Sequence, residues 1–246
     1  MEMFEEDWQK RFERFARDYC ADHLVSGWSE SGLWRRLNLF GELLRDQKLS
    51  NPAHVLDLGC GAATYVRFLA GFGHRVVGLD YSLPSLYRAQ AADSKRVGHY
   101  VGGEAYHLPF CDECFDLVVS IGIFQTLGNP QQALCEMVRV LRPQGLLVVE
   151  FLNAFELVAM GRYAFDKLRG RLPRLRTYSP VEVSHWFDQG GIRFIRRAGV
   201  YLPPRKLPWL EWLFTLKGFV PLLERIPGIS FLGSHAFLMM GKKRGG

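Results

Sequence analysis

The stretch Val55-Leu56-Asp57-Leu58-Gly59-Cys60-Gly61-Ala62-Ala63 decides the fold. A short apolar run ends in a turn that contains two glycines, and a helix is predicted to follow the turn. Because Gly59 and Gly61 have no Cβ, a ligand can approach the main chain closely at both positions. The start of the predicted helix offers unpaired N–H groups to a carboxylate. Taken alone, a strand, a Gly-x-Gly turn and a helix also describe a dinucleotide site.

The alternation of strands and helices continues along the chain. Strands are predicted over 54–58, 75–80, 97–101, 115–122, 145–152, 192–201 and 234–243. Helices are predicted over 3–25, 30–47 and 62–71, after Ser82 as an N-cap, and over 130–141, 154–170 and 179–191. Continuous β-branched runs separated by helices indicate an α/β fold with a parallel sheet that is covered on both faces.

The 246 residues are interpreted as one domain, 1–246. It comprises N-terminal helices over 1–50, a ligand-binding core over 51–152, and a substrate-side part over 153–246 with an insert, a helical lid and the last strands. The aromatic-rich and proline-rich segment 208–229 is the predicted lid.

The positive net charge of the chain indicates which kinds of binding partner to expect. The net charge is +6, with basic residues concentrated between 162 and 176 and in a second group between 193 and 206. Solvated faces of a basic protein explain such groups, and so does a surface for acidic substrates or anionic lipid. No nucleic-acid partner is expected, because no helix-turn-helix, zinc-finger or RNA-recognition signature is present.

The cellular setting is predicted from cysteines and hydrophobic runs. Five cysteines at irregular spacing indicate free thiols in a reducing compartment. The acidic N-terminal segment has no apolar run typical of a signal peptide, and no stretch is long and apolar enough to span a bilayer. A cytoplasmic location is expected.

Two acidic residues narrow the choice of ligand. Asp57 lies two residues before the first glycine, where a buried negative charge opposes a pyrophosphate and suits an ammonium group. Asp80 ends the next strand, where an acid accepts hydrogen bonds from ribose hydroxyls, as it also does in NAD sites. Together they favour a nucleoside that carries an ammonium group.

These residues resemble motif I of the class I S-adenosylmethionine (SAM)-dependent methyltransferases, of the type 11 kind. The resemblance extends to the stretch GGEAYHLPFCDECFDLVVS at 102–120 and to LCEMVRVLRPQGLLVVE at 134–150. It covers about 54–152, with the motifs in the family's order. It implies a Rossmann-like, doubly wound sheet of seven strands, mostly parallel with a final antiparallel strand.

The resemblance also implies roles for individual residues. Asp57 would hold the SAM ammonium group directly or through water, and Asp80 would bind both ribose hydroxyls. The other residues implied to line the cofactor are Gly59, Cys60 and Gly61 beside the methionine part, Tyr81 or Leu83 at the adenine face, Glu104 and Ala105 at the adenine edge, and Ile121 to Phe124 at the sulfonium end.

The sequence departs from the family at three places. Ala63 stands where the family often has glycine, and Glu104 stands where it usually has aspartate. Gln125 and Thr126 follow the fourth strand, where the family often has histidine. That difference removes one candidate acid or base from the site.

Methyl transfer needs little from side chains, because positioning an attacking atom in line with an activated sulfonium does much of the work. A base helps where the nucleophile is a hydroxyl or a protonated amine. The candidates are His107, Tyr178 and His185, although a structural role is the better interpretation of each. His107, Cys111 and Cys114 form a His-x₃-Cys-x₂-Cys array without a fourth ligand nearby, so no metal is predicted.

The sequence predicts transfer of a methyl group from SAM to a small-molecule acceptor. Apolar and basic residues in the substrate-side part favour an amphipathic or lipid-like acceptor with an acidic head, and peripheral contact with a membrane. The acceptor, the attacked atom and the oligomeric state are not specified. A SAM-fold binding module without catalysis and an NAD(P)-binding oxidoreductase are the alternatives.

Overall fold

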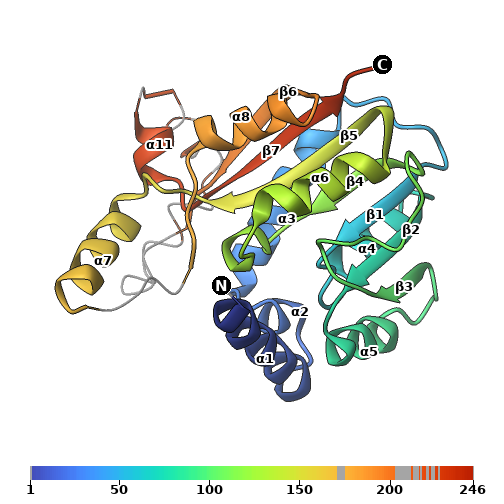
Figure 1. The fold of residues 1–246 in the computed structure, drawn as a ribbon, viewed down its shortest axis with the longest axis horizontal. Coiled ribbons are helices and arrows are strands. Elements are labelled where there is room, and N and C mark those ends of the chain that lie inside the picture. The colour runs from blue at the N-terminus through green and yellow to red at the C-terminus, as the bar shows by residue number, and fades with distance from the viewer. Residues whose placement is uncertain are drawn as a thin grey trace.

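The computed structural model contains one seven-stranded sheet in the order β3-β2-β1-β4-β5-β7-β6 (Figure 1). It describes residues 2–170, 175–202 and 228–245, with single positions between 212 and 226. The strands are β1 (His54–Leu58), β2 (Arg75–Asp80), β3 (Gly98–Gly102), β4 (Phe115–Ser120), β5 (Leu141–Leu152), β6 (Ile192–Val200) and β7 (Ala236–Lys243). Only β7 runs antiparallel to its two neighbours, β5 and β6. The predicted Rossmann-like architecture with a final antiparallel strand is therefore confirmed.

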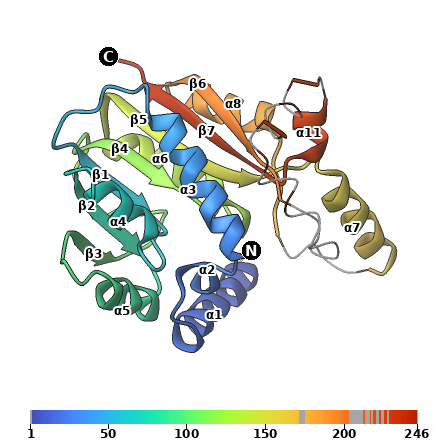
Figure 2. The same cartoon turned by 180° about the vertical axis from the view of Figure 1, so that it is seen from behind.

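Helices cover both faces of this sheet (Figure 2). The longer helices are α1 (Glu2–Asp18), α3 (Glu30–Leu44), α4 (Thr64–Ala70), α5 (Leu83–Ala92), α6 (Pro130–Val140), α7 (Leu157–Leu168) and α8 (Pro180–Gln189), and the shorter ones are α2 (Asp22–Val25), η1 (Phe124–Thr126) and α11 (Ile229–Gly233). Side chains of α3, α4 and α5 form one apolar core with one face. Side chains of α6 and α8 form the second core with the other face. The sheet is doubly wound, as predicted.

Polar caps set where two of the predicted helices begin. Ser82 accepts a hydrogen bond from the Ser85 N–H at the start of α5. Ser179 and Glu182 form a capping box at the start of α8, where Pro180 occupies the first turn. Each arrangement satisfies N–H groups that have no partner within the helix.

The N-terminal prediction of one helix over 3–25 is wrong, because α1 ends at Asp18 and α2 begins at Asp22. The guanidinium of Arg88 on α5 donates to the carbonyl oxygens of Ala16 at 2.7 Å and Arg17 at 3.0 Å. These are among the last carbonyls of α1, so a side chain from another helix satisfies groups that a longer helix would have paired internally.

Two further boundaries differ from the prediction. The fourth helix of the chain, α4, begins at Thr64 rather than at 62, because Ala63 has a left-handed backbone with φ of 65°. The strand β5 begins at Leu141 rather than at 145, and its register against β4 shifts between Phe115 and Leu117. That shift accommodates the turn in which Gln144 has a positive φ.

More than half of the predicted lid over 208–229 falls outside the described residues. Within the described part of the chain, no helix combines the length and the apolar character that crossing a bilayer requires.

Candidate functional site

The glycine turn after β1 is tied to the end of β2. The N–H groups of Gly59 and Cys60 both donate to the carbonyl oxygen of Leu79, at 2.7 and 3.0 Å. Gly59 has a φ of +77°, and a Cβ built on it would lie 2.3 Å from Cγ2 of Ile123. Gly61 has a φ of +51°, and a Cβ there would meet only Ser26 Oγ, at 3.9 Å. The turn is therefore packed against protein at Gly59 and open at Gly61.

Asp80 lies beside the open side of this turn. Its two carboxylate oxygens accept hydrogen bonds from the N–H groups of Gly61 and Ser82, both at 2.9 Å. The side chain is buried, and burial raises the pKa of Asp80 while the two N–H donors oppose that rise. A carboxylate has about four acceptor directions, so about two remain for hydroxyl groups of a ligand.

Asp57 supplies a buried acid without a hydrogen-bonding partner at one oxygen. Its side chain is 1% exposed, and no described residue hydrogen-bonds to its Oδ2. Burial, with a smaller contribution from the negative charge of Asp80, raises the pKa of Asp57 to about 8. An unpaired buried acceptor is costly, so its presence indicates a cationic ligand group that pairs with it.

We expect the affinity for SAM to depend on pH through Asp57. The raised pKa leaves this carboxyl protonated at neutral pH in the free protein, whereas pairing with an ammonium group requires the carboxylate. Binding therefore releases a proton, and the affinity should rise about tenfold from pH 6 to 7 and about fivefold from pH 7 to 8, as the pH approaches the pKa of Asp57. Titration calorimetry at pH 6, 7 and 8 measures this.

The raised pKa of Asp57 also determines how the stability of the free protein changes with pH. Between about pH 4 and 8 the folded state holds a proton that the unfolded state has released, so Asp57 makes the free energy of unfolding fall as pH rises. Asp57→Asn is the control, because it removes the titrating group and should flatten both dependences. An equal pH dependence of SAM binding in Asp57→Asn would contradict this assignment.

The residues predicted to meet adenine lie beyond β2 and β3. Tyr81 is partly exposed, Glu104 is exposed and Ala105 is half-buried. The Gly103 N–H donates to the Asp80 carbonyl at 3.1 Å, which places the 104–105 loop next to the end of β2. Cys60 differs from these, because its thiol packs against Gly78 inside the sheet, so only its backbone faces the turn.

The segment after β4 packs against the glycine turn through Ile123 and against Trp28 through Gly122. Ile121 is buried, and Gly122 has a φ of +91° with Trp28 so close that a Cβ would lie 2.4 Å from its ring. Gln125 Nε2 donates to the Gly122 carbonyl at 2.6 Å, and Thr126 Oγ1 donates to the Ile123 carbonyl at 2.8 Å. The two residues that replace the expected histidine therefore stabilise the local backbone.

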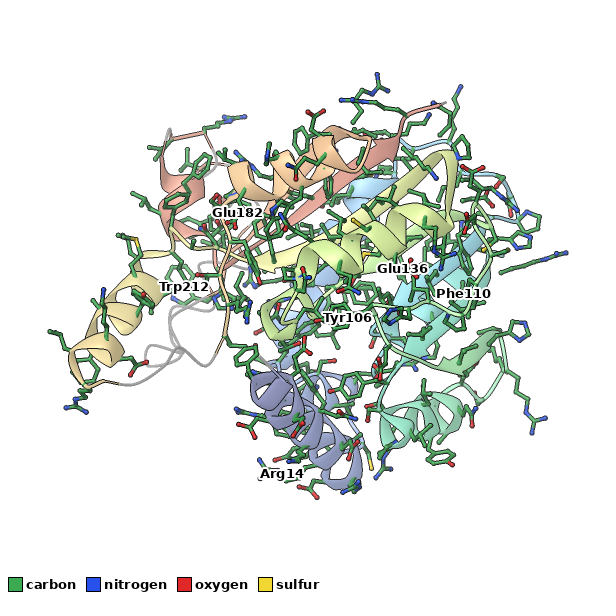
Figure 3. All side chains as sticks on the ribbon, in the orientation of Figure 1. Arg14, Tyr106, Phe110, Glu136, Glu182 and Trp212 are labelled. Carbon is green, nitrogen blue, oxygen red and sulfur yellow. The ribbon has the colours of Figure 1, made fainter. Side chains whose placement is uncertain are left out.

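The helix α1 lies across the carboxyl ends of the strands and is fastened at both ends (Figures 1 and 3). Near its start, Glu5 accepts hydrogen bonds from the Tyr106 hydroxyl and the Gly128 N–H. Near its end, Arg88 binds the last carbonyls. Figure 3 shows Tyr106 above α1, with Arg14 marking the helix itself. The sequence did not reveal this covering, because Glu5 and Tyr106 are 101 positions apart.

A buried ion pair lies on the α3 face of the sheet. Arg36 Nε donates to Glu150 Oε1 at 2.6 Å, and both side chains are at most 2% exposed. The Arg36 guanidinium also lies over the Trp28 ring at 4.4 Å and donates to the Gly32 carbonyl. This pair holds Trp28 against the segment after β4, and the sequence analysis missed it.

The three candidate bases are not brought together. His107 is exposed in the loop after β3, and His185 is exposed on α8, where it contacts Gln189. Figure 3 labels Glu182 on the same helix, which lies above the sheet in this view, whereas α1 lies below it. Tyr178 is buried and its hydroxyl bonds to the Phe124 carbonyl at 3.4 Å, while burial raises its pKa. The environment of Tyr178 favours a structural role, and the two exposed histidines lie in separate parts of the protein.

A histidine and carboxylate pair that the sequence did not reveal lies where β5 ends and β7 begins. His235 Nδ1 is 3.2 Å from Glu156, and the His235 N–H donates to the Val200 carbonyl. The two residues are 79 positions apart, so no local pattern signals them.

The cysteines of the His-x₃-Cys-x₂-Cys array do not form a metal site. Cys114 donates a hydrogen bond to the carbonyl oxygen of Cys111, and the described residues contain no cluster of potential metal ligands.

The comparisons with known proteins agree with this geometry. Residues 56–149 match the family model described as a methyltransferase domain. The chain is 33% identical over 201 residues to the demethylmenaquinone methyltransferase of Mycobacterium tuberculosis, covering 76% of this chain and 81% of that protein. It is 34% identical over 151 residues to the malonyl-[acyl-carrier protein] O-methyltransferase of Pseudescherichia vulneris, covering 60% and 59%.

A solved structure shares the fold. The methyltransferase chain in the complex with the Haloferax volcanii Trm112 methyltransferase activator superposes with a TM-score of 0.65 at 19% identity, covering 98% of this chain and 96% of that chain. The fold and the glycine-turn site define a Rossmann-like methyltransferase. The chain belongs to the class I SAM-dependent methyltransferases, and it is an enzyme of that family.

The residues present fit the SAM that this family implies. The unpaired Oδ2 of Asp57 matches an ammonium group, and the open side of Gly61 leaves room for the methionine part beside the main chain. The remaining acceptor directions of Asp80 match two ribose hydroxyls. Membership of the family removes both an oxidoreductase and a module without catalysis as alternatives.

Proposed function

We propose that this enzyme transfers the methyl group of SAM to a small molecule with an apolar, lipid-like body and an acidic head. The observation that carries the cofactor part is the unpaired Asp57 Oδ2 beside an open glycine turn and an Asp80 that two backbone N–H groups hold in place. When bound, SAM supplies an electrophilic methyl group. The assigned roles are that Asp57 holds the ammonium group, Asp80 the ribose, and Tyr81, Glu104 and Ala105 the adenine.

Trp28 and the 121–124 segment have a separate proposed role beside the reacting atoms. The Gly122 backbone is packed against the Trp28 ring, and the Arg36 guanidinium lies over the same ring at 4.4 Å. Because SAM is already activated, the contribution of these residues is to fix the position of the acceptor and to exclude water. The pocket for the acceptor then lies between the N-terminal helices and the ends of β4 and β5.

Aromatic and basic side chains beyond the end of β5 support an amphipathic acceptor. The ring of Phe155 lies 6.3 Å from that of Phe231, and the Arg197 guanidinium lies over Phe231 at 4.6 Å. The relatives named for demethylmenaquinone and malonyl-[acyl-carrier protein] also support an acceptor in this class. An apolar surface next to a cation suits a molecule that has both a tail and an acidic group.

An acceptor series tests this proposal. The purified enzyme is given SAM and carboxylic acids or phenols that share one head group and differ only in alkyl tail length. S-adenosylhomocysteine formation at limiting acceptor should rise about tenfold for about every two added methylene groups, at about 0.8 kcal/mol per buried CH₂. Equal rates for the shortest and longest members would overturn the amphipathic acceptor, while leaving SAM binding to be judged by calorimetry.

A further inference from the structure

The helix α7 projects from the body of the protein, beyond the end of β5 (Figures 1 and 2). Its large apolar side chains face solvent, with exposed fractions between 48% and 87%. They are Leu157, Val158, Met160, Tyr163, Phe165 and Leu168. A soluble domain normally buries such side chains or uses them to bind another surface.

Five of the six large apolar residues of α7 fall on one side of the helix, and Tyr163 lies outside that side. At 3.6 residues per turn, the positions of Leu157, Phe165 and Leu168, together with Val158 and Met160, lie within an arc of about 160°. The opposite arc carries the charged positions 166, 167 and 169. Since the apolar arc is exposed, its pattern does not serve the core, as the patterns of α3 and α6 do.

The charges on α7 indicate what this arc binds. Lys167 and Arg169 are exposed in and just after the last turn, and Asp166 is the single acidic residue within α7. The Arg169 guanidinium lies over the Phe165 ring at 4.1 Å, so a cation sits at the border of the apolar arc. Cations bordering an exposed apolar helix complement an anionic lipid surface.

We propose that α7 docks the enzyme on the surface of an anionic lipid bilayer. The apolar arc enters the boundary between headgroups and acyl chains, and Lys167 and Arg169 remain at the phosphates, where their stems are apolar and their heads are charged. Docking needs no methyl transfer, so this inference goes beyond the proposed function. It also places the end of β5 next to the bilayer.

Vesicle co-sedimentation of the full chain tests the docking. The wild-type protein should bind vesicles of phosphatidylglycerol and phosphatidylcholine at least about tenfold more tightly than vesicles of phosphatidylcholine alone, because each cation near the surface contributes about 1 kcal/mol. The triple variant L157Q/F165Q/L168Q should lose about a hundredfold in affinity for the anionic vesicles, because three apolar side chains no longer enter the bilayer.

Matched variants separate docking from general loss of apolar surface. F72Q/V181Q changes two side chains away from α7, Phe72 in the turn after α4 (63% exposed) and Val181 on α8 (71% exposed), and it should bind vesicles like wild type. K167E/R169E keeps the apolar arc and should lose the preference for anionic lipid. SAM affinity by calorimetry should be unchanged in all three variants, which shows that each one folds.

Two results would overturn the proposal. One is L157Q/F165Q/L168Q binding anionic vesicles as wild type does. The other is wild type that ignores vesicles but forms a dimer in analytical ultracentrifugation that the triple variant abolishes, because the apolar arc then binds a second copy. Neither result affects the proposed methyl transfer, which the acceptor series tests independently.

Discussion

Asp80→Asn is expected to lower the affinity for SAM by about a hundredfold or more. The carboxylate already accepts hydrogen bonds from the N–H groups of Gly61 and Ser82. Its remaining hydrogen-bond acceptor positions are assigned to two ribose hydroxyls. An amide has one oxygen, so its NH₂ group would face one of those backbone N–H groups. Each hydrogen bond lost to a charged group is worth about 1.5–3 kcal/mol, and two are lost. Titration calorimetry at constant pH measures the change.

Asp93→Asn is the matched control for Asp80→Asn. Asp93 is also buried, and it accepts the N–H groups of Val97 and Gly98 at 3.1 and 2.9 Å. It lies after α5 and binds the start of β3, whereas Asp80 lies at the end of the neighbouring strand β2. Both variants should lower the free energy of unfolding, but only Asp80→Asn should weaken SAM binding. Equal SAM affinities in the two variants would remove Asp80 from the cofactor site.

Gly59→Ala is expected to lower the free energy of unfolding and to abolish detectable SAM binding. An alanine with a φ of +77° costs about 1–2 kcal/mol, and its Cβ would lie 2.3 Å from the branched Ile123 side chain. Because a β-branched side chain has few alternative rotamers, relieving this clash moves backbone, for a total of roughly 2–4 kcal/mol. Chemical denaturation and calorimetry measure the two effects.

Gly61→Ala separates strain from occupation of the pocket. Its φ is also positive, but a Cβ there meets nothing closer than Ser26 Oγ at 3.9 Å. This variant should lose only about 1 kcal/mol of unfolding free energy, yet bind SAM far more weakly because the added methyl fills the open side of the turn. Wild-type SAM affinity in Gly61→Ala would show that the cofactor does not approach this glycine.

The local features of the fold were predictable from sequence because short patterns produce them. The strands β1 and β2 end where Leu58 and Asp80 were expected to end them, and Ser82 and Ser179 cap the helices that they were predicted to cap. The end of α1 was not predictable, because it depends on Arg88 in another helix. Contacts between distant residues leave no periodic signal in a single sequence.

The candidate site divides in the same way. The glycine turn, Asp57 and Asp80 lie within about one strand–helix–strand unit, so their type and spacing pointed to a nucleoside with a cationic group. The residues that surround this turn come from segments far apart in the sequence. Glu5 reaches Tyr106 across 101 positions and Arg36 reaches Glu150 across 114, and both pairings depend on how α1 and α3 pack on the finished sheet.

The Arg36–Glu150 pair limits how far the N-terminus of this enzyme can be truncated without loss of stability. The matched methyltransferase region begins at residue 56, which suggests a truncation that removes the first fifty residues. That deletion would leave the Glu150 carboxylate inside the protein without its cation, at a cost of about 3–5 kcal/mol. It would also strip Phe40 and Leu43 from the sheet. The smallest stable unit is therefore larger than the matched region 56–149, and it includes the helix α3.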